Sequence, residues 1–236
     1  MRCRLSMPRY IDNLLIKFKH PCPQRPHCSP HKCLPISYCA KTQLTPETDT
    51  SELLNNAPKH CIQEIVGSLL YYACAVDKKL LVALSAIEAS QAKTTVTTEQ
   101  AINLLLDYVA TYPHGGIAYQ ASNIILCAHS DVGFLNETQA WSRAVDHIFL
   151  SEDIPFPRFN GTVLSIAQII KLFMASAAEY GCPLHHSTRN DSPFATLIDM
   201  GWSQLKRTIQ TDNSTSAGVV NNTIVPHMSK MMDMRL

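Results

Sequence analysis

The 236-residue sequence has no apolar run that approaches the roughly 18 residues needed to cross a membrane. Residues 1–9 lack the apolar core of a secretion signal. The formal net charge is only +1, so nucleic acid would need a local basic patch, and the basic residues are scattered along the chain. No Gly-x-Ser-x-Gly motif and no phosphate-binding glycine loop is present. These absences argue against a membrane protein, a secreted protein and a serine hydrolase.

Cysteine, by contrast, is frequent, and the number of cysteines is odd. Nine cysteines in a chain without an export signal indicate reduced thiols and a cytoplasmic or nuclear location. With 46% hydrophobic and 17% charged residues, the composition is that of a globular protein, and the length suits one large domain or two small ones. Trp141 and Trp202 could stack on bases, but we expect both in the core.

The spacing of apolar residues changes along the chain. It predicts helices over residues 10–18, 61–92 and 98–112, with no convergent polar groups on the two longer ones. After His114-Gly115-Gly116 the pattern becomes that of strands, near residues 117–129, 140–150 and 161–170. The predicted divisions are a short helix, a Pro/Cys/His-rich linker, a helical segment and a mixed α/β domain, at residues 1–19, 20–58, 59–115 and 116–236.

The linker carries a candidate zinc site. Thiolates and imidazoles are zinc ligands, and seven of these side chains crowd into one short segment. The spacing includes no pair of Cys-x-x-Cys knuckles, and five prolines stiffen the chain, so the alternative is a disordered linker that happens to hold thiols. The seven residues are His20, Cys22, His27, Cys28, His31, Cys33 and Cys39.

Four acidic residues in the second half have contexts that suit a carboxylate cluster. Asp131 ends an apolar, strand-like run, and Glu179 lies in a stretch rich in helix formers. Asp212 follows a short alternating segment and precedes Asn, Ser and Thr, which commonly cap helices. Asp233 lies three residues before the last residue. Each acid alone would be interpreted as a solvated or capping residue.

In this order the four contexts resemble the ribonuclease H domain of copia-type retrotransposon Pol polyproteins. The matching pieces are Ser130-Asp131, Ser176-Ala177-Ala178-Glu179, residues 211–217 and Ser229-Lys230-x-x-Asp233-Met234-Arg235. Upstream, residues 63–73 and 104–113 are similar to the C-terminal, thumb-like region of the reverse transcriptase in the same polyproteins. The paired aspartates of a polymerase palm are absent, so we do not expect DNA synthesis.

The resemblance implies a helical thumb-like segment followed by an incomplete ribonuclease H-like fold with a mixed sheet. Three strands, a helix, a fourth strand and another helix would follow one another. The implied activity is hydrolysis of the RNA strand of an RNA–DNA hybrid with two Mg²⁺ or Mn²⁺ ions, alongside other parts of the polyprotein. Asp131 would bridge both metals, Glu179 and Asp212 would complete one site, and Asp233 would help to hold the other. His227 would be a proton shuttle or an ordinary surface histidine.

The sequence departs from the family pattern in three places. The family's second ligand falls on Gly181 without a gap and on Glu179 with a two-residue deletion, which fits a continuing helix better. Asp146 would place a charge in a strand that should be partly buried. The chain ends at Leu236, so we expect a truncated domain that lacks the helix after Asp233. The alternative function is therefore a catalytically inactive transposon remnant with at most nucleic-acid binding.

Overall fold

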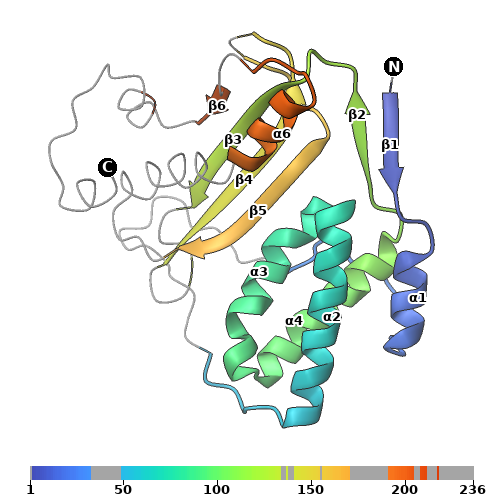
Figure 1. Cartoon of the computed structure of the whole chain (residues 1–236). Helices are drawn as coiled ribbons and strands as arrows, with labels where there is room; N and C mark the ends of the chain where they lie inside the picture. Colours follow the sequence, from blue (N-terminus) through green and yellow to red (C-terminus); the bar gives the residue numbers. More distant parts are fainter. Residues whose placement is uncertain are drawn as a thin grey trace, which may run out of the picture. The chain divides into compact units, whose positions relative to one another are not determined.

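The computed structural model divides the chain into an N-terminal unit, Arg2–Tyr119, and a C-terminal unit that runs from Gln120. Figure 1 shows helices in the first and a sheet in the second, which confirms the expected α/β class with a mixed sheet. In the part of the chain described, no helix is long and apolar enough to cross a membrane. The described residues are 2–32, 49–133, 137, 141–154, 156–170, 191–204, 208–211 and 217.

Four α-helices form the core of the N-terminal unit. Their fully buried side chains include Leu69, Leu84 and Leu105, which recur at the spacing of amphipathic helices. The helices predicted over residues 10–18 and 98–112 are confirmed to within two residues. The elements are α1 (Tyr10–Lys17), α2 (Asn56–Ala75), α3 (Leu81–Ser90) and α4 (Val96–Thr111), with 3₁₀ turns η1 (Lys78–Leu80) and η2 (Gln91–Lys93).

The single helix predicted over residues 61–92 is wrong, because the chain breaks between α2 and α3. Asp77 leaves helical geometry at φ −133° and ψ 81°. Its carboxyl group is buried, and this burial raises its pKa. Gly115 packs so closely here that a Cβ atom on it would lie 2.6 Å from Tyr72 Oη and 2.8 Å from Asp77 Cβ. Tertiary packing of Asp77 therefore overrides the continuing apolar pattern.

Helix α4 begins with a reciprocal cap. The hydroxyl of Thr95 accepts a hydrogen bond from the Thr98 amide, and the Thr98 hydroxyl accepts one from the Thr95 amide, both at 3.3 Å. Thr95 also donates to the carboxylate of Asp49. Hydrogen bonds from Thr95 and then from Ser51 lower the pKa of Asp49 to about 2. This network ties the chain before α2 to the start of α4.

The segment predicted as one strand over residues 117–129 contains two strands in different sheets. β2 (Gly116–Gln120) pairs with β1 (Arg2–Ser6) in a two-stranded ribbon, and β3 (Ile125–Gly133) belongs to the C-terminal sheet. Strand β1 was not predicted; its five residues are all exposed, although its polar and apolar residues alternate.

The C-terminal unit is built on the four-stranded sheet β5-β4-β3-β6. β3 pairs antiparallel with β4, β4 pairs antiparallel with β5, and β3 pairs parallel with β6. Helix α6 (Asp191–Asp199) covers one face of the sheet (Figure 1). Its Phe194 and Leu197 pack on buried Leu126, Ala128 and Ile148. The strands are β4 (Ser142–Ser151), β5 (Thr162–Ile170) and β6 (Thr208–Gln210), and the first two agree with the prediction.

We predict that Leu69→Ala lowers the free energy of unfolding by about 2–5 kcal/mol, because it removes a fully buried side chain from α2 and leaves a cavity. The matched control is Ile16→Ala on α1, where the side chain is 75% exposed and the expected change is within about 0.5 kcal/mol. Urea denaturation followed by circular dichroism measures both. Equal effects of the two variants would contradict the described core.

Candidate functional site

Asp131 lies near the end of β3 on the sheet face opposite α6. Side chains alternate along a strand, so Leu126 and Ala128 face the helix while Asp131 faces the other way. We name this side the outer face; the register places Asp131 opposite Val145, and both side chains are exposed. The outer face is carried by Cys127, His129 and Asp131 of β3 and by Val145, His147 and Phe149 of β4.

A cluster of rings occupies the outer face beside Asp131. His129 and His147 are cross-strand partners, and the ring of Phe159 packs edge-on against both, at centroid distances of 5.3 and 6.0 Å. The Nδ1 atom of His147 lies 3.3 Å from the hydroxyl of Ser165. Phe159 itself is 60% exposed. The cluster therefore fixes the two imidazoles and offers an exposed aromatic ring on the same face as Asp131.

Cys127 is buried further back along the same strand. Burial, and secondarily the charge of Asp153, raise the pKa of its thiol to about 11, against the opposing effect of a backbone hydrogen bond at Ser151. The thiolate is the nucleophilic form of cysteine. Cys127 is therefore a packing residue and not a reactive group.

Two glutamine side chains hold the neighbouring strands in place. Gln204 accepts a hydrogen bond from the amide of Leu126 at 2.9 Å and donates one to the carbonyl of Ile124 at 2.8 Å, which anchors the start of β3. Gln210, the last residue of β6, pairs with His129 and donates from Nε2 to the carbonyl of Pro157. The parallel pairing thus ends two residues before Asp131 on β3.

The other predicted site residues, Glu179, Asp212, Asp233 and His227, lie outside the described residues. The exposed carboxylate of Asp131 is the kind of hard oxygen ligand that Mg²⁺ and Mn²⁺ prefer. Among the residues that the structure describes, however, no three His, Cys, Asp or Glu side chains converge in a way that could hold a metal ion. Among the described residues, Asp131 is therefore the one predicted site residue that could bind a metal ion.

Asp146 and Trp202 of this unit differ in burial. Asp146 is 2% exposed in β4, opposite Ser130, so the sequence was right that a charged residue enters a buried strand. Trp202 follows α6 and is 45% exposed, so its predicted place in the core is wrong. The turn at Gly201, with φ at +89°, carries the chain away from the helix and leaves the indole at the surface.

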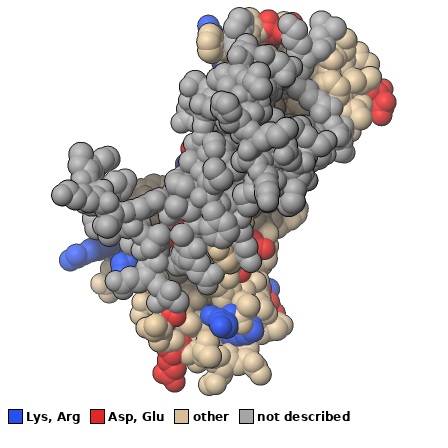
Figure 2. All heavy atoms as spheres, turned by 90° about the vertical axis from the view of Figure 1, so that its left-hand side faces the viewer, with Lys and Arg blue, Asp and Glu red and all other residues tan. Residues whose placement is uncertain are grey.

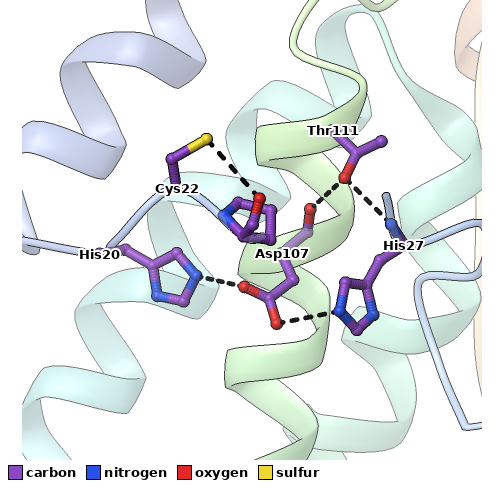
Figure 3. A network of polar contacts seen from close by, with 6 residues as sticks. His20, Cys22, His27, Asp107 and Thr111 are labelled. Atoms are coloured by element: carbon purple, nitrogen blue, oxygen red, sulfur yellow. Dashed lines mark hydrogen bonds and ion pairs between the residues drawn. The ribbon is translucent and has the colours of Figure 1, made fainter. Parts of the chain in front are cut away.

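A second polar cluster lies in the N-terminal unit, where the linker runs along α4 (Figure 3). His20 Nε2 lies 2.8 Å from Asp107 Oδ1, and His27 Nε2 lies 3.5 Å from Oδ2 of the same carboxylate. The amide of His27 donates to the hydroxyl of Thr111, which donates to the backbone carbonyl of Asp107. Helix α4 supplies Asp107 and Thr111 to this cluster, and the two histidines that converge on them come from the distant linker.

The described cysteines of the linker contact protein groups. The Cys22 thiol lies 3.9 Å from the carbonyl of Pro23, and the Tyr112 hydroxyl lies 3.9 Å from the Cys28 sulfur. Cys33 and Cys39 lie outside the described residues. The described section of the linker is thus attached to α4 through Asp107, Thr111 and Tyr112, with His20 and His27 on the one carboxylate of Asp107.

No family model, no curated protein and no solved structure matches this chain. On the face drawn in Figure 2, the described lysines and arginines lie in separate small groups interspersed with acidic residues. The described residues visible on that face therefore form no broad basic field.

We predict that Cys127 reacts with iodoacetamide far more slowly than exposed Cys61 at pH 8. With a pKa of about 11, the Cys127 thiol stays protonated until the pH rises well above 10, and burial also blocks the reagent. The folded protein is labelled for increasing times, and peptide mass spectrometry then measures the alkylation rate of each cysteine. Equal labelling at pH 8 would show that β3 does not bury this side chain.

Proposed function

We propose that the C-terminal unit hydrolyses the RNA strand of RNA–DNA hybrids in a metal-dependent, ribonuclease H-like reaction, as part of a retrotransposon Pol polyprotein. The observation that carries this proposal is the sheet. Three consecutive antiparallel strands are followed along the chain by α6 and then by β6, which pairs parallel with the first strand of the series. A helix between the third antiparallel strand and the parallel strand supports the proposal; this helix is α6, and the segment around Glu179, where the resemblance implies a helix, lies outside the described residues. Asp131 lies on the first strand of the series.

The register of β3 and β6 supports a shared carboxylate site. His129 pairs with Gln210, and the two strands run in the same direction. Asp131 follows His129 by two residues, and Asp212 follows Gln210 by two residues in the sequence. Neighbouring parallel strands bring equivalent positions to the same edge of a sheet, where ligand sites of α/β proteins commonly lie. Asp131 and Asp212 thus follow a paired position by the same number of residues in the sequence, as two aspartates of one site would.

The role proposed for Asp131 follows from its exposure. Its side chain leaves the outer face beside Val145, which is itself exposed and short. A ligand can therefore approach the carboxylate from solvent. Two Mg²⁺ or Mn²⁺ ions, when bound, would supply water activation and stabilisation of the leaving oxygen. Asp131 would contribute a hard oxygen and negative charge to hold them.

A second candidate is a catalytically inactive unit that at most binds nucleic acid. Gly181 and Pro183 disfavour a helix directly after Glu179, the residue proposed as second ligand. Without that ligand, Asp131 would keep its place on the outer face but would bind metal weakly. Weak hybrid binding that falls steeply with salt would then be the remaining activity.

We predict that the full chain cleaves a labelled RNA–DNA hybrid in Mg²⁺ or Mn²⁺ and that Asp131→Asn lowers the rate by at least about 100-fold. Groups that only support a metal ligand cost about 10–100-fold when removed, so loss of a ligand charge should cost at least as much. The matched control is Asp199→Asn, which removes an exposed carboxylate at the end of α6.

The outcomes separate the two candidates. Cleavage by the parent and by Asp199→Asn, with loss in Asp131→Asn, supports the hydrolase. Equal cleavage by all three proteins would place the active site elsewhere. No cleavage by any of them, with circular dichroism showing a folded chain, would leave the inactive, nucleic-acid-binding unit.

A further inference from the structure

The ribbon of β1 and β2 borders an open hollow of about 480 Å³ in the N-terminal unit. Its lining residues are Arg2, Arg4, Gly116 and Ala118. Arg2 and Arg4 are two residues apart on one strand, so their side chains leave the ribbon on the same face with backbones about 7 Å apart. Gly116 and Ala118 are likewise two residues apart on β2, so they share a face of the ribbon, and their side chains are absent or small. The hollow therefore combines two cationic groups with open space.

Both guanidinium groups are available to a ligand. Every residue of β1 is exposed. In the described part of the chain, neither Arg2 nor Arg4 takes part in an ion pair or a hydrogen bond. Five N–H donors in a planar fork, with no carboxylate to neutralise them, match the oxygens of a phosphate group.

Arg4 packs against the backbone of Gly116. A Cβ atom at Gly116 would lie 2.8 Å from Arg4 Nε, 3.3 Å from Arg4 Nη2 and 3.1 Å from the carbonyl oxygen of Leu5. The guanidinium therefore occupies space next to Gly116 that a side chain at this position would share. Arg4 and Gly116 thus border the hollow side by side.

We propose that Arg2 and Arg4 form a phosphate-binding site, which takes a phosphate group of a polynucleotide or a free phosphate ion. The polynucleotide is the expected source, because the hollow is open and lets a long ligand continue past it. The site lies in a different unit from Asp131, and its phosphate chemistry does not depend on the proposed hydrolysis. It would hold a nucleic-acid backbone without reading its sequence.

The test measures binding of a labelled oligouridylate to the full chain by fluorescence anisotropy over a range of salt. Arg4→Gln should weaken binding about five- to tenfold and lower the slope of log affinity against log salt by about 0.7, the value for one lost phosphate contact on a single strand. Arg2→Gln combined with Arg4→Gln should lower that slope by about twice as much. The charge control is Arg25→Gln, an exposed arginine that does not line the hollow.

Gly116→Ala supplies a variant with unchanged charge. It should push the Arg4 guanidinium aside while its charge remains, so it should weaken binding by less than Arg4→Gln does. Gly67→Ala on α2 is its control, because a Cβ atom there meets nothing within 4 Å. Circular dichroism and thermal midpoints confirm that all variants fold.

A parallel titration with inorganic phosphate identifies the source of the ligand. Weaker oligouridylate binding in the Arg2, Arg4 and Gly116 variants, but not in the controls, supports a polynucleotide backbone. Unchanged oligouridylate binding with weaker phosphate binding supports a site for the free ion. If the variants bind both oligouridylate and phosphate as tightly as the controls do, the proposal is overturned. That result would not affect the hydrolysis proposed for the C-terminal unit, which the cleavage assay with Asp131→Asn tests separately.

Discussion

The alternation of side chains along β3 is the constraint on which the C-terminal unit depends. Leu126 and Ala128 are buried under α6, so Asp131, at an odd offset from both, has to leave the sheet on the outer face. A slip of one residue against β4 would bring Asp131 into the apolar layer and expose Leu126. Pairing with β6 occupies the other edge of β3. Burial on one face thereby determines which carboxylate is offered on the other.

Polar contacts between residues far apart in the sequence add to the apolar core of the N-terminal unit. Asp107 on α4 binds His20 and His27 of the linker, and Thr111 one turn later takes the His27 amide. The hydroxyl of Tyr72 accepts from the amide of Gly115, beside the start of the β1–β2 ribbon. These contacts attach segments that have few apolar residues of their own, and the bond to Gly115 lies directly before β2.

The local sequence pattern was sufficient to predict elements whose apolar residues recur at regular spacing. It failed where contacts between distant residues determine the secondary structure. The helices around residues 10–18 and 98–112 were predicted because each buries one periodic face, and the strands β4 and β5 were predicted from strand-like segments bounded by turn residues. The break at Asp77 was missed because apolar residues continue on both sides of it, and β1 was missed because nothing in it is buried. Asp131 at a strand end was predictable from its own segment. Convergence of four distant acids, like the meeting of His20 with Asp107, depends on packing that no local pattern encodes.

The role proposed for Asp131 is that of a ligand of a divalent metal ion on the outer face. Calorimetric titration of Mn²⁺ into the parent chain, Asp131→Asn and Asp199→Asn tests this role directly, without requiring turnover. We expect saturable binding to the parent and to Asp199→Asn, with an affinity at least about tenfold lower for Asp131→Asn. Indistinguishable Mn²⁺ binding by all three folded proteins would contradict it.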